Sequence, residues 1–220
     1  MPVVETYLVR VWLPDRPGAL GQVASRIGAV RGDVVGIDIL ERGAGRAIDE
    51  LIVSLPDGSL VDLLVAEIAQ VDGVDVEDVR AIADPSAHDA RLDALESAAR
   101  LVDSVDGDAL LELLCGDACA DLDADWAAVV DVESAGVGPS VGAVPSGGWL
   151  AAFLAGSRAS EAVASGQAGP DDVAWAPMPA AGRELILGRR GRPFRSRERR
   201  QLAALTRIAD RCWERLLRRV

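Results

Sequence analysis

The stretch TYLVRVWLPDRPGAL, residues 6–20, decides the fold of the first part of this 220-residue chain. Its alternate residues Val9, Val11 and Leu13 are apolar, as in a strand that buries one face. Pro14 ends the strand, and the DRPG connection that follows leads into apolar residues at helical spacing. The stretch therefore predicts a strand, a tight turn and the start of a helix.

The pattern continues outward to residue 82 as one small domain. The further expected elements are helices over about 19–30 and 60–71 and strands over about 34–41, 47–55 and 74–82. The complete order is the ferredoxin-like βαββαβ arrangement of an α+β protein. Both crossovers then pack on one face of an antiparallel sheet. We expect outward apolar residues on the opposite face to need another copy or domain as a cover.

The remainder of the chain predicts a second domain. A helix over about 89–102 carries an apolar stripe formed by Leu92, Leu95, Ala99 and Val102. The later expected elements are helices over 109–120, 149–156 and 196–219, strands over 126–132, 173–178 and 184–188, and a loop or weak edge strand over 134–148. We divide the chain into a first domain at 1–83, a linker helix at 84–105, and a small α/β domain at 106–220 that ends in a long Arg-rich helix.

The composition excludes several classes of enzyme. The chain contains no Lys and no Asn, and His88 is its single histidine. A phosphate-loop or Schiff-base lysine, a Cys-His-Asn triad and a His-rich metal site are therefore excluded. His88 lies in a polar stretch where a solvated imidazole is expected, which disfavours acid–base catalysis. We expect a binding protein with no catalytic residue, no metal and no cofactor.

Charge is divided unevenly along the chain. The formal net charge is −12, yet residues 183–220 hold 13 Arg against 4 acidic residues. The acidic body should repel nucleic acid and anionic lipid, whereas the basic tail could bind either. Alternatively, the cationic helix lies across an acidic surface of its own chain or of a second copy.

The cysteines point to a reducing compartment. Cys115, Cys119 and Cys212 are an odd set, the sequence shows no secretion signal, and no run of about 18 apolar residues could span a bilayer. We expect a cytoplasmic protein that does not bind membranes. Cys115 and Cys119 could be half of a metal site, but with no second pair or histidine nearby, small buried apolar residues are the favoured interpretation.

The first 82 residues resemble an ACT domain, a small ligand-sensing module of amino-acid metabolism. The resemblance rests on the element order, the β-branched first strand, the glycine of the second strand, and a junction that matches a D-x-P-G-x-L turn. It implies that two copies pair side by side or face to face and bind a free amino acid between the first loop and helix of one copy and the second strand of the other. The implied ligand-binding residues are Asp15, Arg16, Pro17, Gly18, Ala19, Leu20, Gly36, Ile37 and Asp38.

The chemistry of the turn supports such a use independently. Pro17 has no amide hydrogen, and Gly18 has no side chain that could block a ligand. The free N–H groups that open the first helix can therefore face an anion, and a carboxylate would fit there.

The charged residues around this turn admit two interpretations. Arg16 could reach the ligand's carboxylate, and Asp15 could cap the helix or accept an ammonium group. Asp38 or Asp49 could approach from the neighbouring copy. The alternative is that Asp15 is only a helix cap, that the turn residues have no further role, and that Arg16 is solvated.

The second half resembles a GAF-type sensory domain. The residues that carry the resemblance are the strand at 126–131 and the sequence Gly191-Arg192-Pro193-Phe194, which stands directly before an amphipathic terminal helix. In that family the last helix commonly pairs in a dimer. Residues 134–170 are few and Gly-rich for a ligand lid, which favours a dimerisation platform in place of a small-molecule pocket.

Two rival uses of the first fold can be excluded. RNA recognition stacks bases on aromatic residues of the sheet, and the strands at 34–41 and 47–55 contain none. Acyl-phosphate hydrolysis on this fold uses an Asn, which the chain lacks.

We therefore expect a non-catalytic regulatory homodimer that binds a free amino acid at the ACT-like interface and signals through the GAF-like domain to an enzyme or regulator. The alternatives are an assembly module without a ligand and a transcriptional regulator that uses the Arg-rich helix. Salt dependence separates the last of these, because phosphate binding weakens steeply with added salt.

Overall fold

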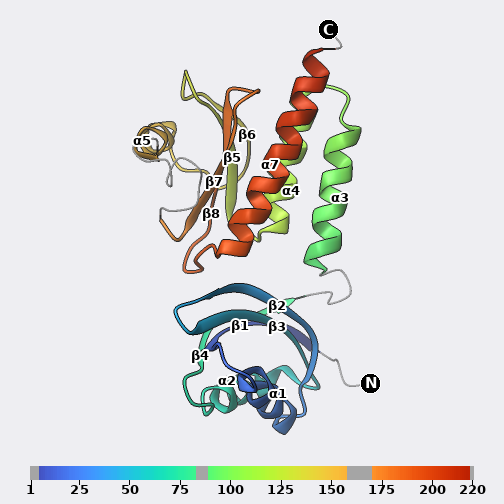
Figure 1. Cartoon of the computed structure of the whole chain (residues 1–220), viewed down its shortest axis with the longest axis vertical. Helices are drawn as coiled ribbons and strands as arrows, with labels where there is room; N and C mark the ends of the chain where they lie inside the picture. Colours follow the sequence, from blue (N-terminus) through green and yellow to red (C-terminus); the bar gives the residue numbers. More distant parts are fainter. Residues whose placement is uncertain (1–4, 83–88, 158–169, 219–220) are drawn as a thin grey trace. The chain divides into compact units, whose positions relative to one another are not determined.

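The computed structural model describes residues 5–82, 89–157 and 170–218 (Figure 1). The chain divides into two compact units, Met1–His88 and Asp89–Val220. Each unit has its own four-stranded antiparallel sheet. No helix in the described ranges combines the length and the apolar character needed to cross a bilayer.

The first unit has the ferredoxin-like topology that the sequence predicts. Its elements are β1 (Glu5–Pro14), α1 (Ala19–Ala29), β2 (Asp33–Gly43), β3 (Arg46–Leu55), η1 (Gly58–Leu60), α2 (Val61–Ile68) and β4 (Asp75–Ile82). The sheet order is β2-β3-β1-β4, with every neighbouring pair antiparallel. Both helices lie on the same face of this sheet (Figure 1). β2 and β4 are consequently the two edge strands.

One apolar core joins this sheet to its helices. Alternate residues of β1 and β3 supply the sheet side, and Val23, Ile27 and Leu64 are among the fully buried residues of the helices. Val9 and Leu51 lie directly opposite each other in the β1–β3 pair and are both fully buried. Each fully buried side chain of this size contributes about 1.5–3 kcal/mol relative to an exposed one.

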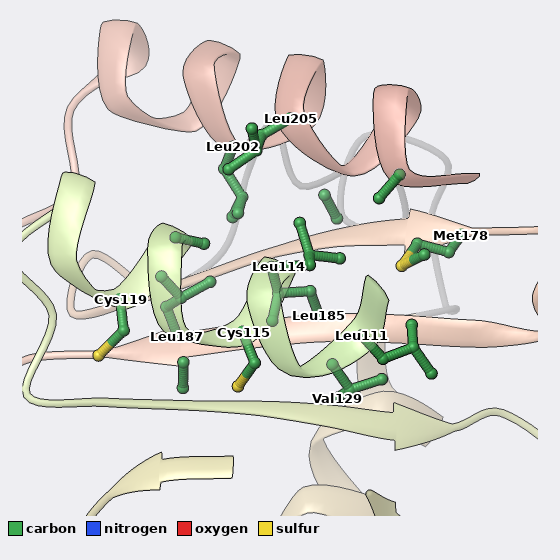
Figure 2. Close-up of a cluster of buried hydrophobic side chains, with 14 of the residues drawn as sticks. Leu111, Leu114, Cys115, Cys119, Val129, Met178, Leu185, Leu187, Leu202 and Leu205 are labelled. Carbon is green, nitrogen blue, oxygen red and sulfur yellow. The ribbon is translucent and has the colours of Figure 1, made fainter. Parts of the chain in front are cut away.

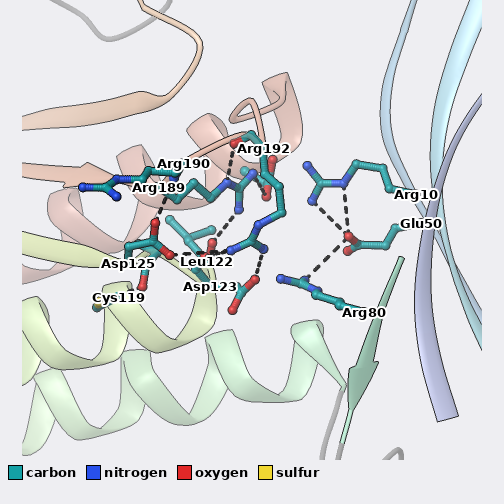
Figure 3. Close-up of polar contacts among 12 residues, drawn as sticks. Arg10, Glu50, Arg80, Cys119, Leu122, Asp123, Asp125, Arg189, Arg190 and Arg192 are labelled. Atoms are coloured by element: carbon teal, nitrogen blue, oxygen red, sulfur yellow. Dashed lines mark hydrogen bonds and ion pairs between the residues drawn. The ribbon is translucent and has the colours of Figure 1, made fainter. Parts of the chain in front are cut away.

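The sheet face opposite the helices carries charged residues of β1, β3 and β4 (Figure 3). Arg10 Nη2 and Arg80 Nη2 lie 2.9 and 3.8 Å from Glu50 Oε1. Trp12 Nε1 donates a hydrogen bond of 3.1 Å to Glu77 Oε1. The apolar surface that the sequence predicts on this face is thus replaced in part by an ion cluster.

The second unit is a sheet between two helical layers. Its elements are α3 (Ala90–Asp103), α4 (Gly107–Asp121), β5 (Trp126–Asp131), β6 (Val137–Gly142), α5 (Gly147–Ser157), β7 (Val173–Met178), β8 (Arg183–Gly188) and α7 (Ser196–Leu217). The sheet order is β6-β5-β8-β7, so the stretch predicted as a loop or weak edge strand forms edge strand β6. α3, α4 and α7 lie on one side and α5 on the other (Figure 1). The expected linker helix is α3, which packs with α4 and α7 inside this unit, whereas residues 83–88 lie outside the described ranges.

The two adjacent cysteines belong to the larger core of this unit (Figure 2). Cys115 Sγ lies 3.5 Å from the carbonyl oxygen of Pro139, and Cys119 Sγ lies 3.3 Å from that of Ala124. Burial raises the pKa of Cys115 to about 12 and also raises the pKa of Cys119. Both thiols are protonated at neutral pH, which agrees with their interpretation as small apolar residues and opposes a reactive or metal-binding role.

Arg189 fixes the connection between β8 and α7 (Figure 3). Its side chain is fully buried, and its guanidinium donates hydrogen bonds of 2.7–2.9 Å to four acceptors, the carbonyls of Leu122, Arg192 and Pro193 and Glu198 Oε1. Glu198 also accepts from the backbone N–H of Arg195 at 2.6 Å and so caps α7. The GRPF sequence is therefore explained by structure: it wraps the carbonyls of a turn around one buried cation.

The predicted buried face of α3 is wrong. Ser97 and Leu101 are the residues that α3 buries, whereas Leu92, Leu95 and Val102 are exposed. The inner face is selected by close packing and by polar contacts, since Arg100 donates hydrogen bonds of 3.0 Å to Ser97 and to Asp117 of α4. The apolar stripe is left on the outside.

Glu198→Ala should lower the free energy of unfolding of the second unit by about 3–5 kcal/mol, because it leaves Arg189 as a buried cation without its counter-charge. Urea denaturation followed by tryptophan fluorescence measures this directly, since four of the five tryptophans lie in this unit. Glu214→Ala, which removes solvent-accessible ion pairs on α7, should change the value by less than about 1 kcal/mol. Equal losses in the two variants would contradict this account.

Candidate functional site

The start of α1 is an open helix N-terminus. Gly18 is the N-cap residue, with φ at 88° and ψ at −13°, and no side chain caps the helix. The Gln22 amide donates to Gly18 O at 3.0 Å and the Ala19 amide to Arg16 O at 3.3 Å. Among the described residues, no backbone carbonyl or capping side chain accepts from the amides of Leu20 and Gly21. Two main-chain donors and the positive end of the helix dipole therefore meet at one point.

Gly18 has a conformation that keeps this point accessible. A Cβ added there would meet no atom within 4 Å, so the space beside Gly18 itself is open. The positive φ disfavours most other residues, because L side chains rarely adopt this region. Glycine is thus required by the turn and also leaves room above the amides.

The loop before α1 is attached to the turn between β2 and β3. The Asp15 amide donates to Gly45 O at 2.9 Å, and Asp15 Oδ1 lies 4.0 Å from Arg42 Nε. Asp15 makes no capping hydrogen bond, so its interpretation as a helix cap is wrong. Its carboxylate instead lies beside the exposed side chain of Arg42.

Asp49 is a buried carboxylate close to this loop. It pairs across the sheet with Val11 of β1 and Ile39 of β2, and Val11 belongs to the core beneath the helices. Only 3% of Asp49 is exposed, and its Oδ1 accepts no hydrogen bond from the described residues. Burial raises the pKa of Asp49, the positive charge of Arg42 opposes the shift, and the negative charge of Asp15 adds to it. A buried carboxylate oxygen without a hydrogen bond is costly, so a cation beside Asp49 would be stabilised.

Asp49 also lies close to the loop that precedes α1 in its own chain. The expectation that Asp38 or Asp49 approaches the ligand from a neighbouring copy stays a prediction. The electrostatic coupling of Asp49 to Asp15 and Arg42 shows that the three charged groups are neighbours.

The second half of the predicted site lies along the edge strand. Gly36, Ile37 and Asp38 pair with Ile52, Leu51 and Glu50 in the middle of β2. A Cβ on Gly36 would come within 2.8 Å of Ile52 Cδ1, so a larger residue there would require the Ile52 side chain to shift. The loop at residues 15–20 is attached near the far end of β2, at Gly45.

The structure therefore leaves the two halves of the predicted site separate within one chain. Residues 15–18 and Ile37 are exposed, Leu20, Gly36 and Asp38 are partly exposed, and Ala19 is buried. Among the described residues, no hydrogen bond joins Gly36 or Ile37 to residues 15–20. A complete site would need the edge strand of a second copy.

The edge strand carries exposed apolar side chains that would suit a second copy. Val35, Ile37 and Ile39 are 52%, 43% and 39% exposed. A long edge strand with such residues is a template for pairing with another strand. Ile39 lies directly opposite Asp49, so this edge reaches the buried carboxylate.

The second unit has an open groove of about 580 Å³ between aromatic and charged walls. Its lining includes Trp126, Trp149, Asp125, Asp172 and Arg190. Trp149 meets Trp126 edge-on at 6.2 Å and stacks on Phe153 at 5.4 Å between ring centroids. The aromatic side chains of the groove pack against one another. Because acidic and basic residues both line the groove, it does not by itself specify one ligand.

No family model matches the chain, and no curated protein matches it. The chain is similar to the ACT domain of a GTP pyrophosphokinase from Chlorobium tepidum, with 16% identity over 36% of this chain and 100% of that one and a TM-score of 0.30. It is also similar to the C-terminal domain of the MgtC protein from Mycobacterium tuberculosis, with 19% identity, coverage of 39% and 93%, and a TM-score of 0.30. An unknown protein from Galdieria sulphuraria has 12% identity, coverage of 61% and 76%, and a TM-score of 0.33. The ferredoxin-like assignment rests on the strand order of the first unit.

Asp49→Asn should raise the thermal midpoint of the first unit at pH 7. The folded-state pKa of Asp49 lies above the unfolded one, so the wild-type chain loses stability as the pH rises from the ordinary carboxyl pKa through the raised one. The Asn side chain has no charge to desolvate, so the variant lacks this pH-dependent loss of stability. Calorimetry of the full chain between pH 4 and 8 compares the two, with the exposed Asp72→Asn as a control. A lower midpoint for Asp49→Asn at pH 7 would show that the carboxylate is satisfied.

Proposed function

We propose that this chain is a non-catalytic regulatory protein that binds a free amino acid at the start of α1. One observation carries the proposal: the buried Asp49 carboxylate, which has no hydrogen bond at Oδ1 from the described residues, is electrostatically coupled to Asp15 in the loop that leads into the uncapped helix α1. The helix N-terminus favours an anion and the carboxylate a cation. A zwitterion of the size of an amino acid satisfies both.

The ligand's carboxylate faces the amides of Leu20 and Gly21 in this proposal. Arg16 is exposed at the same turn and can contribute a charge-assisted hydrogen bond. Asp49 binds the ammonium group of the ligand. The N–H donors of that group replace the water molecules that the carboxylate loses on burial. The ligand thus gains binding free energy because it removes the desolvation penalty of Asp49 in the empty site.

A second copy completes the site through its edge strand. Ile37 and Ile39 supply apolar surface, and the unpaired backbone of β2 can continue the sheet into the partner. A ligand enclosed at this seam binds the pair better than the single chain. Its binding therefore shifts the equilibrium toward the pair, which is the regulatory signal.

The second unit transmits this signal in the proposal. Its strand order β6-β5-β8-β7, with helices on both faces and a long terminal helix, supports the GAF-like assignment. Its output is an altered contact with an enzyme or regulator in the cytoplasm.

The internal contacts of the Arg-rich helix disfavour the transcriptional regulator. Arg211 pairs with Glu214 at 2.9 Å, Arg215 donates to Val102 O at 2.6 Å, and Arg199 donates to Pro170 O at 2.8 Å. These guanidinium groups serve the unit's own structure and do not form a continuous basic stripe for phosphates.

A thermal-shift screen of the full chain against the proteinogenic amino acids tests the proposal. A ligand at a hundred times its dissociation constant adds about 2.7 kcal/mol of stability and should raise the midpoint by several degrees. Gly18→Asp should abolish the shift, because it places bulk and negative charge where the carboxylate binds. Gly182→Asp is a matched control, since that glycine also has a positive φ and open space and lies in the second unit.

Two results of this screen would contradict the proposal. If no amino acid moves the wild-type midpoint, the first unit is an assembly module without this ligand. If Gly18→Asp keeps the shift, the ligand binds elsewhere.

The affinity for the amino acid should fall as the pH drops through the raised pKa of Asp49, because protonation removes the charge that pairs with the ammonium group. Asp49→Asn should lose about tenfold or more in affinity, the equivalent of 1.4 kcal/mol, while its fold is retained. Isothermal titration calorimetry at pH 5 and pH 7.5 measures both effects. An affinity independent of pH and of this substitution would remove Asp49 from the site.

A further inference from the structure

We infer that α3 carries a self-association surface through which two copies of the chain pair in parallel. The surface consists of Leu92, Leu95, Ala99 and Val102, and is called here the α3 seam. The three larger residues are 52%, 68% and 46% exposed, and Ala99 is also exposed. Isolated surface leucines are ordinary, whereas a contiguous row on one helix is a mark of an interaction site.

The spacing of the seam is that of a coiled coil. Its residues are separated by three, four and three positions, which places Leu92 and Ala99 at heptad position a and Leu95 and Val102 at position d. The opposite side of α3 buries Ser97 and Leu101 within its own unit. The helix therefore has two apolar faces, and among the described residues only one of them is buried.

α3 is already fixed in the conformation that pairing requires. The Asp89 carboxylate accepts from the amides of Arg91 and Leu92 and caps the helix. Arg100 bonds to Asp117 of α4, and Arg215 of α7 donates to Val102 O at 2.6 Å. Four helical turns would be marginal alone, but a helix held by its neighbours has no ordering cost on association.

The charges beside the seam favour a second copy in parallel orientation. Exposed Arg91 and Glu96 occupy heptad positions g and e, which face each other across a parallel pair. Arg91 of one copy then meets Glu96 of the other on both sides of the two-fold axis. An antiparallel pair would instead bring Glu96 opposite Asp103, and like charges there repel.

This surface is separate from the proposed ligand site. The seam lies in the second unit, whereas the exposed edge strand β2 lies in the first. The inference therefore stands without the amino-acid proposal, and the two have different tests.

Ala99→Cys tests the parallel seam in the full chain. In a parallel pair the a positions adjoin their own counterparts, so the two introduced thiols come within disulfide reach, which requires Cα atoms less than about 7 Å apart. The native cysteines are all buried and do not compete. Mild oxidation should yield a covalent dimer at least about tenfold faster than with Ala66→Cys, a substitution at an exposed position on α2 of the first unit.

Charge reversal identifies the orientation. In the Ala99→Cys background, Arg91→Glu should slow cross-linking because it opposes two acidic residues, and adding Glu96→Arg should restore the rate. Asp72→Arg, at an exposed position of the first unit, should leave cross-linking unchanged.

Three results would overturn the inference. They are equal cross-linking rates for Ala99→Cys and Ala66→Cys, no covalent dimer with Ala99→Cys, and no effect of Arg91→Glu. The second would point to a different partner helix on the seam, and the third to a non-parallel contact.

Discussion

The burial of the Asp49 carboxylate, close to the charged loop that precedes the uncapped helix α1, is the constraint on which the proposed site depends. The register of β1, β2 and β3 places Asp49 opposite Val11 and Ile39. A charged group buried there without a partner costs free energy. Gly18 keeps the adjoining helix end bare. In the proposed function, a zwitterionic ligand would satisfy both the helix amides and the Asp49 carboxylate.

The chain treats two buried charges in opposite ways. Arg189 is surrounded by three carbonyls and Glu198, and its role is to fix a turn and the start of α7. Asp49 has no hydrogen bond at Oδ1 among the described residues. A fully satisfied buried charge adds order to a structure, whereas an unsatisfied one costs stability, and we propose that a ligand relieves this cost at Asp49.

Periodicity predicted the elements of both units because local spacing decides helix and strand. It failed for the buried face of α3, since spacing reveals an apolar stripe but not whether that stripe meets its own chain or another one. Ser97 and Leu101 pack inward, and the seam faces out. Asp49 could have been placed inward from its alternation with Ala47 and Leu51. The absence of a hydrogen bond at Asp49 Oδ1 could not have been predicted from the sequence, because tertiary packing decides which donors lie near this atom.

A carbon-detected NMR titration of the Asp49 carboxyl group in the full chain tests the central claim most directly. The account predicts a pKa above the ordinary aspartate value in the free chain, and a marked fall when the stabilising amino acid is added. A carboxyl group that titrates at its ordinary value, or whose titration no amino acid changes, would contradict it.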